Sequence, residues 1–191
     1  MNSDDDQIHF ECTKCGACCR EDSLLVTITG HDIARISMGL GLSSNEIIRA
    51  IDFYLVSSNE TPKGFRDIPA VNTEKGPAYI ALKKLENKDC IFLKNDLCMI
   101  HTIRPVVCMS FPFVFRNDTE LNWGLSAMQK ICPGLGKGPK VNISELREIA
   151  LVVLEDLNSY RTFVEEWNRV EKKPTANRLI EAILSDSRFS V

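Results

Sequence analysis

The sequence lacks an excess of charge of either sign, since 23 Lys and Arg residues stand against 26 Asp and Glu, for a formal net charge of -3. Binding to a phosphate backbone relies on clustered Lys and Arg side chains. The composition therefore predicts that nucleic acid is not the main partner of this chain.

Long apolar runs are also missing. None approaches the roughly 18 residues that a membrane span needs, and the acidic stretch 1–10 has neither the basic nor the apolar part of a secretory signal. We therefore expect a soluble cytoplasmic protein without membrane contact. With 191 residues, 44% hydrophobic and 26% charged, the chain has the composition of a globular domain and enough length for one core.

Cysteine, in contrast, is abundant. The eight cysteines form one cluster and a dispersed set, namely Cys12, Cys15, Cys18 and Cys19, followed by Cys90, Cys98, Cys108 and Cys132. In a reducing compartment such a pattern reports metal binding or redox chemistry more often than a disulfide framework, which remains the alternative. Sulfur-rich sites select Zn²⁺ or an iron–sulfur cluster over Mg²⁺ or Ca²⁺. We therefore predict that all eight cysteines are metal ligands, in one or two sites.

The spacing of these cysteines slightly favours iron. Three cysteines at C-x-x-C-x-x-C, completed by a remote cysteine that precedes proline, are similar to the ferredoxin arrangement, and Cys132-Pro133 matches that role. Zinc accepts the same loops, so it stays open. Adjacent side chains diverge, which suggests that Cys18 and Cys19 serve different sites. The predicted partition is Cys12, Cys15, Cys18 and Cys132 in one site, and Cys19, Cys90, Cys98 and Cys108 in the other.

The segment 90–100 predicts a β-hairpin whose loop length fixes the faces of two cysteines. A two-residue turn at Asn95-Asp96 would pair Leu93 with Cys98 and put Cys90 on the opposite face, whereas a three-residue loop would put both cysteines on one face. A shared metal therefore predicts the three-residue loop.

Other polar residues beside these cysteines are weaker candidates. Lys14, Arg20 and Arg104 are placed to balance thiolate charge, and His101 has the spacing of a nitrogen ligand, although eight cysteines already complete two sites. His9 and His31 are predicted to be ordinary surface residues. The stretch 134–138 is formally G-x-G-x-G, but proline follows before any helix, so we predict a turn rather than a dinucleotide site.

The first half of the chain predicts short elements. A strand over 23–28 leads to a helix that Thr29 caps with Asp32 and that ends at Gly39 or Gly41, and a second capping box, Ser43 with Glu46, predicts another helix through 47–55. The stretch 57–77 predicts a long loop, long enough to be a candidate lid. A strand follows over 78–85, and the aromatic block 111–115 predicts packing beside the site.

The last third of the chain predicts helices. Asn142 and Glu145 cap a long helix, and a break at Pro174 precedes a second one. One apolar seam runs along the long helix through Leu146, Ala150, Val153, Leu157, Tyr160, Val164 and Trp167. The preferred interpretation is packing on its own domain, while a homodimer or another protein partner on the 146–167 seam stays open.

These elements predict an α+β fold, in which a small irregular cysteine-cluster domain carries a short antiparallel hairpin or sheet, flanking short helices and a long C-terminal helical segment. The predicted division is a metal-binding domain over 8–140, with helices over 141–191 packed on it or extending it.

The combined motif resembles that of a known family. Phe10-x-Cys12-x-x-Cys15-Gly16-x-Cys18-Cys19, Cys90-x-Phe92-Leu93, Cys98-x-Ile100, Arg104-Pro105-x-x-Cys108, Phe111-Pro112 and Cys132-x-Gly134 are similar to the CxxCxxCC cysteine-cluster proteins, a zinc- or iron-chelating family. The resemblance implies that the matching cysteines bind metal. Flagellin lysine N-methylases carry a similar cysteine motif, which implies iron–sulfur, S-adenosylmethionine-linked chemistry for some relatives. Two departures are His101, where the family often has tyrosine, and Met109, where arginine is common.

Three functions therefore remain open. The leading one is a metal-binding protein whose site is structural or serves electron transfer or metal handling. The others are an iron–sulfur enzyme, methyltransferase-like or redox, and an interaction module in which zinc is structural.

Overall fold

The computed structural model describes residues 8–56, 68–115, 123–126 and 129–190. The strands are β1 (His9–Phe10), β2 (Ile51–Leu55), β3 (Val71–Thr73), β4 (Gly76–Leu82), β5 (Leu93–Lys94), β6 (Leu97–Cys98), β7 (Phe113–Phe115), β8 (Trp123–Leu125) and β9 (Leu135–Lys140). The α-helices are α1 (Ala17–Arg20), α2 (Gly30–Leu40), α3 (Ser44–Ile47), α4 (Val106–Ser110), α5 (Ile143–Val170) and α6 (Ala176–Ser185). Short 3₁₀ turns are η2 (Ile48–Ala50), η3 (His101–Ile103), η4 (Gln129–Ile131) and η5 (Ser187–Phe189).

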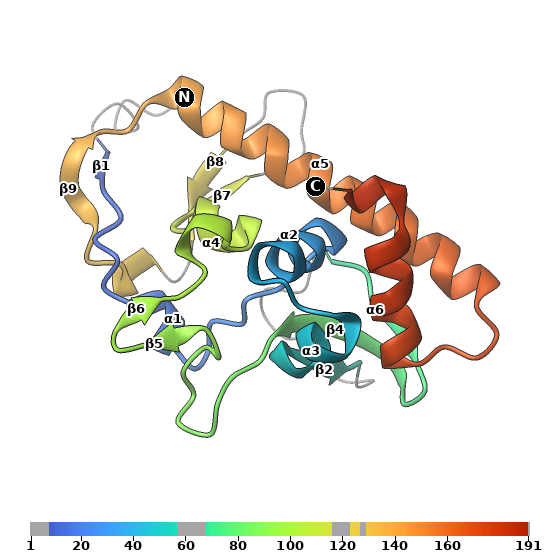
Figure 1. The fold of residues 1–191 in the computed structure, drawn as a ribbon. Coiled ribbons are helices and arrows are strands. Elements are labelled where there is room, and N and C mark those ends of the chain that lie inside the picture. Colours follow the sequence, from blue (N-terminus) through green and yellow to red (C-terminus); the bar gives the residue numbers. More distant parts are fainter. Residues whose placement is uncertain (1–7, 57–67, 116–122, 127–128, 191) are drawn as a thin grey trace.

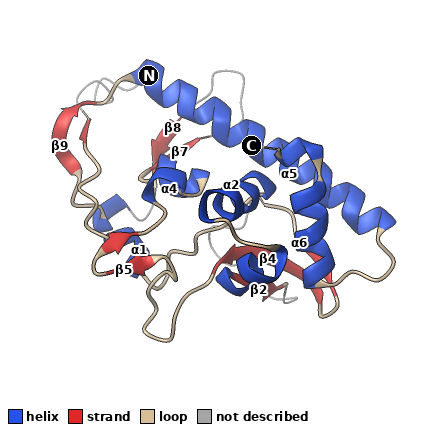
Figure 2. Cartoon of the chain, in the orientation of Figure 1, coloured by secondary structure: helices blue, strands red, loops and turns tan. Residues whose placement is uncertain are grey.

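These elements form an α+β fold of small antiparallel sheets and helices, as predicted (Figures 1 and 2). The largest sheet has the order β2-β4-β3, and the pairs β1-β9, β5-β6 and β7-β8 form separate two-stranded sheets. In Figure 1, β1, β9 and the β5-β6 hairpin lie at one end of the molecule and α6 lies at the other, with α5 running along one side. The cysteine-bearing segments belong to the first of these ends.

The hydrophobic core lies between α2, the β2-β4-β3 sheet and the two C-terminal helices. Its fully buried members include Ile33 and Ile36 of α2, Ile80 of β4, Tyr160 of α5 and Ile180 of α6. One core therefore crosses the boundary predicted at residue 140, although the division into two domains stays a prediction. Among the described residues, no helix is both long and apolar enough to cross a membrane.

The seam of α5 faces this core rather than solvent. Leu146, Ala150, Tyr160, Val164 and Trp167 are buried, and α5 contacts α2, α4 and β3. The preferred interpretation of the seam, packing on its own chain, is therefore confirmed for these five residues, whereas Val153 and Leu157 are half-buried. A partner on the 146–167 seam stays a prediction.

Both capping boxes predicted in the first half are present. In α2, the Thr29 amide donates to Asp32 at 3.0 Å and the Asp32 amide donates to the Thr29 hydroxyl at 3.3 Å. Gly41, with a φ of 64°, ends this helix in the left-handed region that glycine adopts without strain. At α3, the Glu46 carboxylate accepts from the amide and hydroxyl of Ser43 at 2.8 and 2.6 Å.

The helix predicted through residue 55 is wrong beyond residue 50. After α3 and η2 the chain becomes β2, which pairs along its whole length with β4, from Ile51 opposite Leu82 to Leu55 opposite Ala78. The residues of β2 include isoleucine, phenylalanine and tyrosine, which favour strands, and their spacing satisfied a helical pattern by coincidence. Pairing with a distant strand overrode the local signal.

Two further predictions changed in detail. The strand expected at 23–28 is an extended segment that joins the sheet through one bridge, Thr27 opposite Ala81, while the strand expected at 78–85 is present as β4. The lid predicted at 57–77 falls mostly on residues 57–67, outside the described residues. The rest of that stretch contains β3 and its turn into β4, so it is part of the sheet.

Replacing Gly30 with alanine is expected to destabilise the protein by about 1–3 kcal/mol, the cost typical of overpacking a core. An alanine Cβ would stand 2.4 Å from Cζ of Phe189, whose side chain is buried. In an open helix the same change would stabilise by about 1 kcal/mol. Urea unfolding of Gly30→Ala checks the sign, and Phe189→Leu in the same background should recover part of the loss. Stability equal to or above the parent protein would contradict this account.

Candidate metal centre

The first four cysteines lie on a tight loop followed by one helical turn. Lys14 and Gly16 have φ values of 54° and 70°, and these left-handed residues curl the loop between Cys12 and α1. The Arg20 guanidinium closes the loop by donating to the Cys15 carbonyl oxygen at 3.0 Å. Cys12 and Cys15 are exposed at this position, whereas Cys18 and Cys19, on α1, are half-buried.

The β5-β6 hairpin brings two of the remote cysteines to α1. Leu93 pairs with Cys98 across a two-residue turn, where Asn95 and Asp96 have φ values of 48° and 65°. The prediction of a three-residue loop is therefore wrong. Alternation does not extend back to Cys90, because β5 begins only at Leu93, after a turn in which the Leu93 amide donates to the Cys90 carbonyl at 2.8 Å.

Direct contacts hold this hairpin against α1. The Cys90 amide donates to the Cys19 carbonyl at 2.8 Å, and Arg20 forms an ion pair with Asp96 at the tip of the hairpin. Lys84 donates its ammonium group to the carbonyls of Cys19 and Glu21, at 3.3 and 2.8 Å. Direct contacts thus join the first cysteine cluster to the segment that carries Cys90 and Cys98.

The cysteines line two adjacent cavities. The inner cavity, of about 40 Å³, has five cysteines in its wall, and its other lining is almost entirely apolar: Cys18, Cys19, Cys90, Cys98 and Cys108, with Leu24, Leu25, Val26, Leu82, Ile100, Pro105, Val107 and Phe111. The outer cavity, of about 70 Å³, adds three more cysteines and a histidine, namely Cys12, Cys15, Cys132 and His101. Cys18, Cys19, Cys98, Cys108 and Arg104 line both cavities. All eight cysteines are therefore gathered in one region from five parts of the chain.

Four cysteines line both cavities, and we call this group the shared wall. Hydrogen bonds between their thiols change the pKa values of three of them. Cys19 donates toward Cys18 and Cys98, and these bonds lower the pKa of Cys18 to about 7 and that of Cys98 to about 6, while raising the pKa of Cys19. The nearby Arg104 guanidinium also lowers the pKa of Cys18 and of Cys98. Burial raises the pKa of Cys90 and of Cys108. Two thiols at the wall are thus poised to ionise, and thiolate is the form that binds metal.

The outer cavity brings together residues from both ends of the motif. Burial raises the pKa of the Cys132 thiol, and the charges of Cys15 and Cys12 raise it further. The Cys12 Sγ atom lies 3.9 Å from His101 Nε2. Burial and the cations Arg104 and Lys14 lower the pKa of His101, which favours the neutral imidazole.

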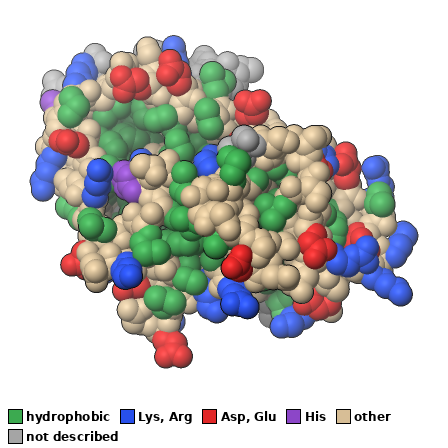
Figure 3. Space-filling model, in the orientation of Figure 1, with side chains coloured by type: hydrophobic (Ala, Val, Ile, Leu, Met, Phe, Trp, Pro, Cys, Tyr) green, Lys and Arg blue, Asp and Glu red, His purple; other side chains and the backbone are tan. Residues whose placement is uncertain are grey.

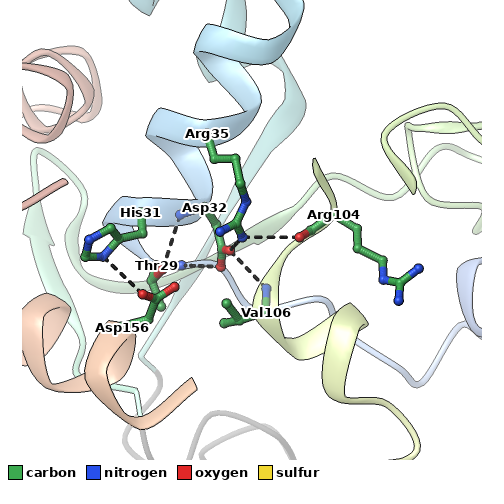
Figure 4. A network of polar contacts seen from close by, with 7 residues as sticks. All are labelled: Thr29, His31, Asp32, Arg35, Arg104, Val106 and Asp156. Carbon is green, nitrogen blue, oxygen red and sulfur yellow. Dashed lines mark hydrogen bonds and ion pairs between the residues drawn. The ribbon is translucent and has the colours of Figure 1, made fainter. Parts of the chain in front are cut away.

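Arg104 lies between these cavities and a buried polar network that sequence reasoning missed. Figure 4 shows the Arg104 carbonyl facing Arg35, at 3.2 Å, while its guanidinium extends away on the other side. The completely buried Asp32 carboxylate accepts from Arg35 at 2.6 Å and from the Val106 amide at 3.0 Å. The capping pattern in the sequence identified Asp32 as a helix-capping residue. Its burial, however, depends on α4, which is distant in sequence.

The other predicted candidates are placed as follows. His9 is exposed, as predicted, and its Nδ1 lies 3.0 Å from the Gly138 carbonyl oxygen. His31 is half-buried, 3.4 Å from Asp156, because the N-terminus of α2 packs against α5, so its prediction as a surface residue is wrong. The segment predicted as a glycine turn, 134–138, belongs mostly to β9, which pairs with β1. Met109 is exposed.

The donor atoms that line the two cavities suit zinc or iron. Most of them are cysteine sulfurs, and the cavities also contain the imidazole of His101, a common ligand of both metals. All eight cysteines are free thiols. Within the described ranges, however, no three His, Cys, Asp or Glu side chains have donor atoms already arranged to hold an ion. Binding would therefore draw the sulfurs toward a common centre.

Comparison with known families agrees with this chemistry. Residues 11–133 match the family model CxxCxxCC, described as "Putative zinc- or iron-chelating domain", and this span includes all eight cysteines. The chain belongs to this family. No curated protein and no solved structure matches it.

Proposed function

We propose that this chain binds zinc or iron through its eight cysteines at two adjacent centres, one in each cavity. The observation that carries the proposal is that five separate parts of the chain bring every cysteine to the same pair of cavities. Three cysteines belong to the outer cavity alone, Cys90 to the inner cavity alone, and the remaining four to the wall between them.

Charge compensation at this wall supports the proposal. A four-thiolate centre that holds Zn²⁺ or a [4Fe–4S]²⁺ cluster carries a formal charge near -2. Arg104 lines both cavities together with Cys18 and Cys98, and its positive charge lowers the pKa of both thiols. The apolar lining of the inner cavity limits access of water, which protects bound thiolates from protonation and exchange.

Between the two metals, our prediction remains an iron–sulfur cluster, on the run of three cysteines at the N-terminus and on Cys132 before Pro133. Such a cluster supplies one-electron redox chemistry, whereas zinc supplies structural cross-linking. A reducing compartment such as the cytoplasm is part of the proposal, because it keeps the thiols free to bind metal.

Anaerobic purification with metal analysis tests this function directly. We expect iron and sulfide in the protein, with broad absorbance near about 400 nm from sulfide-to-iron charge transfer. A colourless protein with stoichiometric zinc would overturn the iron–sulfur assignment and leave the metal-binding function standing. Protein that holds neither metal, and takes up neither after anaerobic reconstitution, would overturn the function itself.

A further inference from the structure

We propose that His101 is the fourth protein ligand of the outer centre, which would make that centre a Cys₃His site rather than a four-cysteine site. The proposal rests on the function proposed above and names the donor set of one of its two centres. The other three ligands are Cys12, Cys15 and Cys132. The inner centre then uses cysteines only.

The residues that line only the outer cavity lead to this assignment. The partition suggested by the sequence gave Cys18 to the outer site, but Cys18 lines both cavities, as do Cys19, Cys98 and Cys108. The cysteines that line the outer cavity and not the inner one are Cys12, Cys15 and Cys132. An ion held by these three sulfurs needs a fourth donor, and the imidazole of His101 lines this cavity and not the inner one.

The position of His101 supplies that donor. Its Nε2 atom is 3.9 Å from the Cys12 sulfur, and both residues line the outer cavity. A tetrahedral ion bound to sulfur at about 2.3 Å and to nitrogen at about 2.05 Å holds the two ligand atoms about 3.6 Å apart. The observed separation is therefore within a few tenths of an ångström of a shared ion, and the Cys12 loop is exposed and free to make that adjustment.

The backbone fixes the histidine on this side of the cavity. His101 begins η3, three residues beyond the end of the β5-β6 hairpin, and η3 contacts α2. The Arg104 guanidinium lies against the same ring, where Nη1 is 3.3 Å from Nδ1 and also contacts Nε2. A metal ion and this guanidinium compete for one lone pair, so metal binding displaces Arg104 from Nε2. The thiolates of Cys18 and Cys98 offer the displaced cation alternative partners.

Figure 3 shows hydrophobic side chains, the class that includes cysteine in that view, on the surface at the end of the molecule where β1 and β9 lie, with histidine atoms at the same end. The other two histidines of the chain line neither cavity, and His9 instead contacts β9 and His31 contacts α5. They therefore provide internal controls, and His9, exposed like the outer site, is the better matched of the two.

Cobalt substitution of the metal-free full-length protein tests the donor set without any activity assay. Co²⁺ has ligand-field bands whose wavelength increases as nitrogen ligands are replaced by sulfur. We expect the parent protein to bind two equivalents, one with a mixed sulfur–nitrogen spectrum. His101→Ala should weaken one of the two sites at least about a hundredfold, more than the tenfold to hundredfold typical of losing a supporting residue. His9→Ala should change neither site.

His101→Cys distinguishes a ligand from a structural residue. As a ligand replacement it should restore the second equivalent and move its bands to longer wavelength, toward a four-sulfur spectrum. Two equivalents with unchanged spectra in both His101 variants would overturn the assignment of His101 alone. Failure of His101→Cys to restore a site lost in His101→Ala would also overturn it. Parent protein that binds less than two equivalents of cobalt would instead overturn the two-centre function.

Discussion

Removing the metal is expected to release residues 8–25 from the rest of the protein while the helical core stays folded. Of these residues only Gly16 is buried, so the segment has almost no hydrophobic core of its own. Its strand β1 pairs with β9, in which five of the six residues are exposed. Hydrogen bonds to Lys84 and Cys90 give a few contacts, and metal ligation would provide the rest. Metal binding and folding are coupled in such sites.

The expected effect is large because structural metal sites contribute on the order of 10 kcal/mol. We expect amide protection in 8–25 to fall at least about a hundredfold on chelation, equivalent to about 2.7 kcal/mol of local opening. Amides of α2, β4 and α6 should keep their protection, since Ile33, Ile80 and Ile180 are fully buried in the common core. Hydrogen exchange followed by mass spectrometry measures both regions at once.

Cys98→Ser should reproduce this local release in protein prepared with metal. Cys98 lies at the shared wall, where its thiol contacts Cys19 and its charge interacts with Arg104. The matched control is Leu97→Ser on the same strand, because Leu97 is 59% exposed and lines neither cavity. Equal protection of 8–25 in the parent protein, the chelated protein and Cys98→Ser would show that packing, rather than metal, holds the segment.

Asp32→Ala is expected to destabilise the whole fold by about 3–5 kcal/mol, the cost of removing one partner of a buried ion pair. Asp32 accepts hydrogen bonds from the Thr29 and Val106 amides and from Arg35, and its side chain is completely inaccessible (Figure 4). Its loss leaves the half-buried Arg35 guanidinium without its carboxylate and two amides without an acceptor. Urea unfolding measures the change.

The second capping box provides the matched control. Glu46 occupies the same third position of its helix, but its carboxylate is exposed and accepts its hydrogen bonds from the neighbouring Ser43. Glu46→Ala should therefore cost about 1 kcal/mol or less, as expected for a surface cap. Equal effects of the two substitutions would mean that Asp32 acts as a cap alone and that its contacts with Arg35 and Val106 contribute nothing to stability.

The charge of Asp32 also predicts a pH dependence. Burial raises its pKa to about 6, against the stabilising effect of the Thr29 amide, Arg35 and the Val106 amide. An aspartate in the unfolded chain titrates near about 3.9. The folded state therefore binds this proton more tightly, so the contribution of Asp32 to stability is largest below about pH 4 and falls by about 3 kcal/mol as pH rises to about 6. The stability difference between the parent protein and Asp32→Asn should follow this curve, and a difference constant from pH 4 to 7 would contradict the raised pKa.

Several features of the fold follow from local sequence. The Thr29–Asp32 and Ser43–Glu46 pairs start α2 and α3 as predicted, because a capping box needs only residues three apart in the chain. The 3.6-residue periodicity of α5 and α6 likewise identified the faces that are buried. The family was also recognisable from the cysteine motif alone.

The failures share a different cause. Residues 51–55 form β2 because β4 offers a partner edge, and nothing within the segment specifies that partner. The two-residue turn at Asn95-Asp96 was available from the sequence, but the assumption that β5 extends to Cys90 was not supported. A turn at residues 90–93 lets Cys90 and Cys98 line the same cavity, contrary to the alternation expected of a continuous strand.

The sequence by itself determined the family, the α+β class, the helix starts and the number and chemical type of the candidate metal donors, because these depend on residue type and short-range spacing. Only the tertiary structure decided which sulfurs lie together, that Cys18 lines both cavities, that His101 lies beside Cys12, and that Asp32 is buried against Arg35 and Val106. Each of these facts depends on contacts between segments that are about 75–90 residues apart. Such contacts are fixed by packing of the whole chain around its core rather than by any local pattern.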